Sequence, residues 1–190
     1  MHYRFWRLLS AGLASFAVML GPIAAAQDTV DRMTAFAVAT NQEATLASTP
    51  VDILIIRWST DAERSLMIDA LLTDGPSKMQ DVLSDLPRVA IIRQATTLGI
   101  EFHFASRQVM EDKSERIILL AGRQITLWKV PQRADIDQYP FTLVEVRLGP
   151  DGTGEGKVSL ATRAIADKRN KKIIMEDYAH EPVRLENVKR

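Results

Sequence analysis

The spacing of apolar residues changes to a period of two near residue 88 and keeps that period to the C-terminal end. Before this point, two short runs rich in alternating or β-branched apolar residues, 33–40 and 51–58, predict strands. Two segments whose apolar residues recur at helical spacing follow them. Beyond residue 88, apolar residues recur at every second position between short polar or glycine-containing turns, which predicts antiparallel strands.

Local start and stop signals set the bounds of the two predicted helices. Thr60 and Glu63 have the spacing of a capping box, so we expect the first helix to begin near Asp61 and to end at Asp-Gly-Pro, residues 74–76. The second is expected over residues 77–86, before a proline. Each helix has one apolar face, made of Leu66, Met67, Ala70 and Leu71 in the first and of Met79, Val82, Leu83 and Leu86 in the second.

The remaining chain predicts a sheet. Strands are expected over residues 89–93, 99–110, 115–120, 125–130, 141–148, 157–165, 172–175 and 182–188. The charged segment 111–114 is the expected turn of a hairpin. The pattern therefore predicts an α+β fold, a curved, mainly antiparallel sheet with two short helices packed on one side.

The segment 148–163 has four glycines and a lysine within ten residues, which suggests either a phosphate-binding loop or the bend of a hairpin. A P-loop needs a glycine five residues before its Gly-Lys pair, where this chain has Asp151, and a Ser or Thr after the lysine, where it has Val158. The following residues alternate as a strand, whereas a phosphate cradle requires a helix. We therefore predict a hairpin bend, with Asp151-Gly152 in the turn.

The N-terminal segment has the composition of a signal peptide. Arg4 and Arg7 precede the uncharged, mostly apolar residues 8–20, and three alanines end at Ala26. This order predicts cleavage between Ala26 and Gln27. The alternative is an uncleaved anchor, because about twenty apolar residues can span a bilayer. Alanine, glycine, serine and proline dilute the segment, which favours cleavage and leaves one domain over residues 27–190.

Composition then limits the chemistry of the mature chain. Without residues 1–26 the chain has 22 basic and 24 acidic side chains, a formal charge of −2, which gives no electrostatic reason to expect a nucleic acid partner. The sequence contains no cysteine, so disulfides, thiol nucleophiles and a lipid-modified cysteine are excluded. We expect a periplasmic or extracellular protein with no cofactor, no metal and no transmembrane segment after cleavage.

Histidine chemistry offers one candidate site. Strand alternation over residues 99–110 predicts Glu101, His103 and Arg107 on one face, with Phe102 and Phe104 on the other. A carboxylate, an imidazole and a guanidinium on one face can orient a ligand or act as acid and base, although any half-exposed strand has the same alternation. No ligand-spaced histidine cluster occurs in the sequence, so we predict no metal site.

Two tryptophans complete the candidate binding residues. Trp58 ends a predicted strand just before a helix, and Trp128 lies in the strand predicted over residues 125–130. Each is able to border a ligand, but packing against the core is the simpler interpretation. The basic turn 168–172 is similarly interpreted as a solvated hairpin tip rather than an anion site, because acidic residues flank it.

Three segments carry a family resemblance: RWSTDAER (57–64), YPFTLVEVRLGPDGTGEGKVSLATR (139–163) and YAHEPVRLENVKR (178–190). Together they resemble a group of uncharacterised exported bacterial proteins with a signal peptide and one small domain. The resemblance implies that the three segments belong to one unit. It implies no activity and no site residue.

Two functions remain open at this point. The favoured one is an exported binding or interaction protein of the bacterial envelope, whose partner is a small apolar ligand or an envelope protein, with Trp58, Glu101, His103, Arg107 and Trp128 at the site. The alternative is a secreted hydrolase that uses His103 with a nearby carboxylate. The absence of any local catalytic motif favours binding over catalysis.

Overall fold

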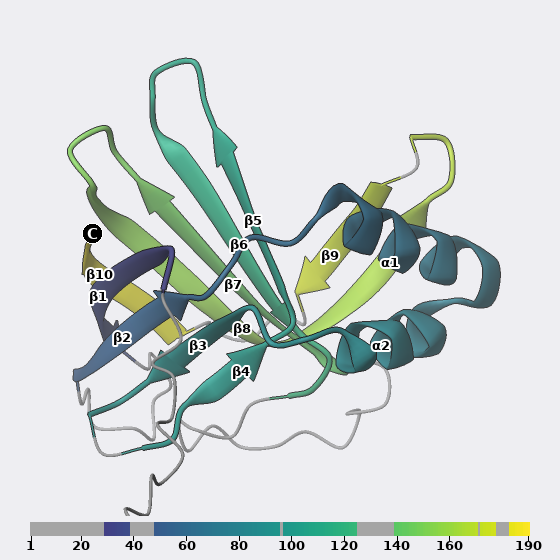
Figure 1. Cartoon of the computed structure of the whole chain (residues 1–190), viewed down its shortest axis with the longest axis horizontal. Coiled ribbons are helices and arrows are strands. Elements are labelled where there is room, and N and C mark those ends of the chain that lie inside the picture. Colours follow the sequence, from purple (N-terminus) through teal and green to yellow (C-terminus); the bar gives the residue numbers. More distant parts are fainter. Residues whose placement is uncertain (1–28, 39–47, 96, 125–138, 171, 178–182) are drawn as a thin grey trace, which may run out of the picture.

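The computed structural model describes residues 29–38, 48–95, 97–124, 139–170, 172–177 and 183–190. Within these ranges it has two helices, α1 (Asp61–Asp74) and α2 (Pro76–Asp85), and ten strands in one curved, unclosed sheet (Figure 1). The strands are β1 (Asp31–Val38), β2 (Thr49–Ile55), β3 (Ala90–Arg93), β4 (Ile100–Phe102), β5 (Phe104–Val109), β6 (Glu115–Ala121), β7 (Phe141–Leu148), β8 (Thr153–Asp167), β9 (Lys172–Asp177) and β10 (Val183–Lys189). The predicted α+β class is confirmed.

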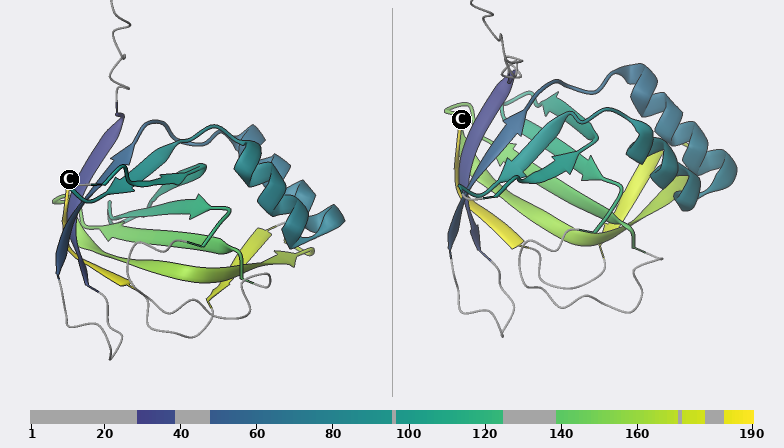
Figure 2. Two further views of the ribbon diagram at one scale, coloured as in Figure 1. Left: turned by 90° about the horizontal axis from the view of Figure 1, so that it is seen from below. Right: turned by 60° about the horizontal axis from the view of Figure 1, so that its bottom comes forward.

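The strand order explains the curvature of the sheet. The order is β4-β3-β2-β1-β10-β8-β7-β6-β5, with β9 paired to the far half of the long strand β8, and every pairing among these strands is antiparallel. The two end strands, β4 and β5, are consecutive in the chain and are separated only by His103. Figure 2 shows the resulting bend, in which β1–β4 face β6–β8 across the interior.

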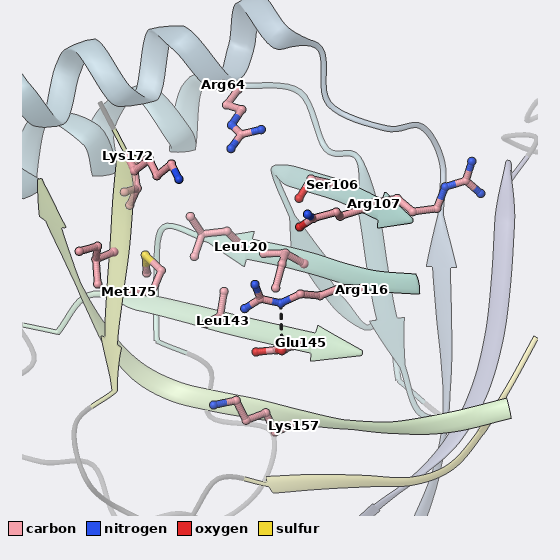
Figure 3. Close-up of a pocket in the computed structure, with 14 residues that line it drawn as sticks. Arg64, Ser106, Arg107, Arg116, Leu120, Leu143, Glu145, Lys157, Lys172 and Met175 are labelled. Carbon is pink, nitrogen blue, oxygen red and sulfur yellow. Dashed lines mark hydrogen bonds and ion pairs between the residues drawn. The ribbon is translucent and has the colours of Figure 1, made fainter. Parts of the chain in front are cut away.

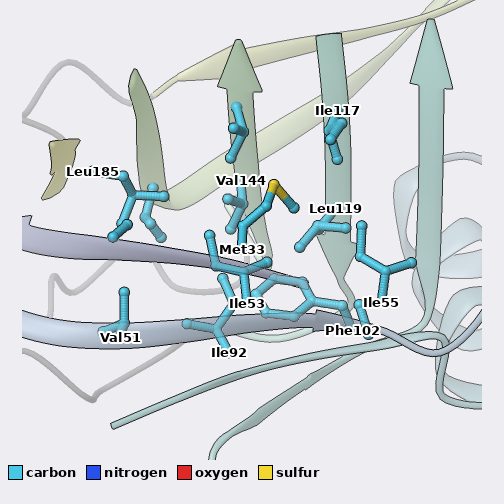
Figure 4. Close-up of a cluster of buried hydrophobic side chains, with 14 of the residues drawn as sticks. Met33, Val51, Ile53, Ile55, Ile92, Phe102, Ile117, Leu119, Val144 and Leu185 are labelled. Carbon is cyan, nitrogen blue, oxygen red and sulfur yellow. The ribbon is translucent and has the colours of Figure 1, made fainter. Parts of the chain in front are cut away.

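The main core fills this interior (Figure 4). Alternate residues of β1, β2 and β3 point inward and meet inward-pointing residues of β6, β7 and β10. Each fully buried aliphatic or aromatic side chain stabilises the fold by about 1.5–3 kcal/mol. The largest fully buried members are Phe102, Met33, Ile53, Ile55, Ile92, Ile117, Leu119 and Leu148.

A second apolar cluster holds the helices against the other face of β6 and β7. Leu119 points into the main core, whereas its neighbour Leu120 packs under the helices with Phe141. Both faces of β6 are therefore covered at this end, which explains its continuous apolar run. The helical members of the cluster are Met67, Leu71, Met79 and Leu83. These four were predicted to face inward, whereas Leu66, predicted with them, is exposed.

Helix α1 begins with the predicted capping box. The Thr60 hydroxyl accepts a hydrogen bond from the Glu63 amide at 3.2 Å, and the Glu63 carboxylate accepts one from the Thr60 amide at 2.8 Å. The same carboxylate receives two hydrogen bonds from Arg57, at 2.6 and 2.9 Å. Chiefly because of the Arg57 hydrogen bonds, the pKa of Glu63 is lowered to about 2.

This ion pair predicts acid sensitivity. Because the pKa of Glu63 in the folded chain lies below its ordinary value of 4.5, its stabilising contribution is complete above about pH 4.5 and is lost as the pH falls toward 2. After allowance for partial exposure, we expect the contribution to be on the order of 1–2 kcal/mol. Urea unfolding between pH 6 and about pH 2 measures this contribution. Glu63→Gln should flatten the pH dependence of the free energy of unfolding, while the glutamine side chain still accepts the hydrogen bond of the capping box. Glu186→Gln, on the exposed face of β10, should leave this pH dependence unchanged, and equal slopes for all three proteins would contradict the assignment.

The glycine-rich segment is a hairpin bend, as predicted. It joins β7 to β8, and the Gly149 amide donates to the Thr153 carbonyl at 2.8 Å. Gly152 has φ +76°, a left-handed conformation that glycine adopts without strain. The turn is followed by strand, and β8 begins at Thr153, four residues before the predicted start.

One prediction about side-chain direction is wrong. The predicted strand 99–110 is broken at His103, so Phe102 points into the main core whereas Phe104 belongs to the cluster beneath the helices. The chain changes partner at this residue, since the Phe102 carbonyl accepts from Val89 while the His103 amide donates to Leu120. The two-residue alternation is therefore interrupted. The predicted strand 125–130 lies outside the described residues.

Candidate binding groove

A groove of about 870 Å³ lies between helix α1, strand β9 and the face of β5–β8 that is turned away from the main core (Figure 3). Its volume falls in the range of pockets that enclose one small ligand. Its polar lining comprises Arg64 of α1, Ser106, Arg107 and Gln108 of β5, Arg116 of β6, Glu145 of β7, Lys157 of β8 and Lys172 of β9. Its apolar lining comprises Ile118, Leu120, Leu143, Ile173, Ile174 and Met175.

The strand register orders the floor of the groove from apolar to charged. Residues directly opposite each other in paired strands lie on the same face, so each position along β6 defines a row across four strands. The rows, from the helices outward, are Phe104, Leu120, Leu143 and Ser159; then Ser106, Ile118, Glu145 and Lys157; then Gln108, Arg116, Arg147 and Glu155. The floor is thus apolar under the helices and charged at the other end.

Among the residues that the structure describes, Glu145 is the one carboxylate that lines the groove, and two guanidinium groups balance its charge. The Nε atoms of Arg116 and Arg147 lie 3.0 and 2.9 Å from the same carboxylate oxygen, and the side chain is only 9% exposed. Burial, the largest single influence, raises the pKa of Glu145, but the hydrogen bonds from Arg116 and Arg147 together outweigh it and leave the pKa lowered. The carboxylate therefore stays ionised and its charge is fully neutralised.

Two more cations line the groove from α1 and β9, which lie next to each other. Figure 3 shows Arg64 reaching from α1 toward the floor and Lys172 reaching from the start of β9. Arg64 has no ion-pair partner among the residues that the structure describes. With Arg116 and Lys157, these residues give the groove an excess of positive charge, which in a partly enclosed space favours an anion.

Two of the residues predicted for the site, Trp58 and Arg107, meet in the structure. The Arg107 guanidinium lies 5.4 Å from the centre of the Trp58 ring and 4.0 Å from Glu115. Trp58 itself packs against the main core. Only the near part of Arg107 therefore borders the groove, and Figure 3 shows its side chain directed away from the other cations.

Glu101 and His103 have separate partners. Arg88 donates to Glu101 at 2.5 Å, and His103 Nδ1 lies 2.6 Å from the Leu86 carbonyl at the end of α2. Because a carbonyl only accepts, the imidazole donates from Nδ1. No hydrogen bond joins Glu101 to His103, and neither residue lines the groove. Trp128 lies outside the described residues. Within the described ranges, no group of three or more potential ligands is placed to hold a metal.

Sequence reasoning missed Arg64, Arg116, Glu145 and Lys157, and it interpreted Lys172 as part of a solvated basic turn, whereas Lys172 lines the groove. One signal was present in strand β7, where alternate positions read Phe141, Leu143, Glu145 and Arg147, apolar at one end and charged at the other. Such a gradient within a strand marks a face that leaves the core and enters solvent. Recognising a groove also needs the register of four strands and the position of α1, which no local pattern supplies.

Comparisons with protein-family models, curated proteins and solved structures found no match. The geometry of the groove is therefore the main structural guide to function. No helix in the part of the chain that the structure describes is long and apolar enough to cross a membrane.

Proposed function

We propose that this protein is an exported binding protein whose groove holds a ligand that carries negative charge. The N-terminal sequence, with its basic start, apolar run and alanines before residue 27, supports export to the periplasm or the cell exterior. The observation that carries the binding function is the excess of cations from α1, β6, β8 and β9 around one groove. Because the groove has this excess of positive charge, we expect an anionic ligand in place of the apolar molecule that the sequence predicted.

The chemistry of these side chains favours holding an anion over transforming it. Arginine and lysine remain charged near neutral pH, so they bind anions without a proton transfer. An acid–base mechanism needs a group that gains and loses a proton within reach of the ligand. The imidazole of His103 does not line the groove, and Glu101 is bound to Arg88, so the described contacts lend the hydrolase hypothesis no support.

A matched pair of fluorescent probes tests this proposal. Anilinonaphthalene sulfonate and phenylnaphthylamine share an aromatic skeleton, but only the first carries a negative charge. We expect the purified protein to bind the sulfonate more tightly and the difference to shrink as salt is added. Arg64→Gln should weaken sulfonate binding about fivefold, because it removes a charged hydrogen-bond donor from the wall.

Lys78→Gln is the control, because it removes one positive charge from an exposed position of α2 that does not line the groove. We expect this variant to bind both probes as the parent protein does. Equal affinity for the two probes, or equal weakening by both substitutions, would contradict the proposed function.

A further inference from the structure

The apolar base and cationic rim of the groove together define the ligand class. We infer that the ligand is a single-chain anionic amphiphile, bound as one molecule with its chain on the base and its anionic head at the rim. This inference rests on the proposed function, since it assigns a ligand class to the same groove. It adds the orientation of the ligand and the length of its chain.

The site for the hydrocarbon chain of the ligand consists of residues in the row nearest the helices and of residues in β9. Leu120 and Leu143 form the floor there, and Met175 stands beside them on β9 (Figure 3). Ile118 and Ile173 continue the same surface, and both are only half-buried, so they have apolar area left to cover. Methionine adapts its shape to flexible apolar groups, which suits a hydrocarbon chain.

The head site lies where the rows become charged. Arg116 and Lys157 belong to the outer two rows, and Arg64 approaches from α1. Lys172 pairs with Asp167, beyond Met175 and Ile173, so it lies at the other end of the groove and takes no part in the head site. Glu145 is already bound by two arginines, so it offers no net repulsion to an incoming anion. A phosphate or carboxylate head at this place is able to accept several charge-assisted hydrogen bonds.

The spacing of residues along β6 also predicts the length of the ligand's hydrocarbon chain. Arg116 and Leu120 are four residues apart on β6, which is about 13 Å along a strand. An extended hydrocarbon of roughly ten carbons, at about 1.3 Å per carbon along its axis, spans this distance. Beyond this row the side chains of the second apolar cluster already fill the space beneath the helices, so we expect longer hydrocarbon chains to gain no further contact.

An extended acidic peptide is the competing occupant. Strands β5 and β9 both line the groove, and each pairs with one strand only among those described. A peptide added to either edge would place alternate side chains along the whole groove. The separation of Leu120 and Leu143 from Arg116 and Lys157 along the strands matches an amphiphile better, because that molecule also has an apolar part and a charged part.

A chain-length series tests the inference by calorimetry with the purified protein, using inorganic phosphate and the hexyl, octyl, decyl, dodecyl and tetradecyl phosphates below their micelle-forming concentrations. We expect affinity to rise about fourfold per methylene up to decyl phosphate and then to level off. Ile118→Ser should reduce the ratio of decyl to hexyl affinity severalfold. Ile91→Ser, at an equally half-buried position on β3 outside the groove, should leave this ratio unchanged.

Other outcomes separate this inference from the proposed function. If inorganic phosphate binds as tightly as decyl phosphate, or a hexaglutamate peptide binds and the alkyl phosphates do not, the groove takes an anion but the amphiphile assignment is wrong. Association only with phosphatidylglycerol vesicles would also overturn the single-molecule assignment. If neither the alkyl phosphates, the peptide nor anilinonaphthalene sulfonate binds, both proposals fail.

Discussion

Replacing Gly154 by alanine should lower the free energy of unfolding by about 4 kcal/mol. A Cβ at this position would lie 1.9 Å from the carbonyl oxygen of Arg147 and 2.9 Å from its carbonyl carbon. Both are backbone atoms of the paired strand β7, so no side-chain rotation relieves the contact. Strands β7 and β8 would have to separate next to their turn. Urea unfolding should show this loss, and the melting temperature should fall by about 10 °C.

Gly152 provides the matched control within the same hairpin. It has φ +76°, which asparagine tolerates, and its added Cβ would meet only the Cβ of Arg190 at 3.6 Å, an ordinary contact. We expect Gly152→Asn to cost less than about 1 kcal/mol. If Gly154→Ala lowered the free energy of unfolding as little as Gly152→Asn does, this would contradict the close approach of β7 and β8 at Gly154.

Phe102→Ala should have a similarly large effect, about 4 kcal/mol. The Phe102 side chain is 0% exposed and stands in the main core between the two halves of the curved sheet. Removing the ring leaves a cavity. The surrounding strands fill this cavity only in part, because backbone hydrogen bonds to neighbouring strands hold them in place. Phe36→Ala on β1 is the control, because Phe36 is 44% exposed and should cost less than about 1 kcal/mol. Chemical denaturation of both variants measures the difference.

Combining Phe102→Ala with Phe104→Ala extends this test to the bend at His103. The two rings belong to different apolar clusters. The losses of unfolding free energy in the two single variants should therefore add up to the loss in the double variant within about 0.5 kcal/mol. On an unbroken strand the same rings would lie side by side and their losses would be coupled. A coupling well above 0.5 kcal/mol would therefore favour the regular strand that the alternation predicts.

Local chemistry made several elements predictable. The capping box of Thr60 and Glu63 specifies a helix start by hydrogen bonds within four residues, and α1 begins where it predicts. Asp151-Gly152 similarly specifies a turn, because glycine accepts the left-handed conformation found there. Strand β7 has the predicted bounds, since its apolar run is set off by turn residues on both sides.

The bend and the groove depend on contacts between distant residues. At His103 the chain leaves β3 as its partner and joins β6, and both of these strands are at least ten residues away in the sequence. The groove needs the register of β5 to β8, which brings Arg116, Glu145 and Lys157 together from three strands. Periodicity within one segment gives each strand its two faces but does not say which residues of other strands share them.

Amide chemical-shift mapping of the isotope-labelled protein with decyl phosphate shows directly whether this groove holds an anionic ligand. We expect the shift changes to concentrate at groove residues such as Arg64, Ile118, Lys157 and Lys172, and Glu101 and Phe36 to be unaffected. Shifts concentrated around Glu101 and His103, with the groove residues unchanged, would contradict binding in this groove.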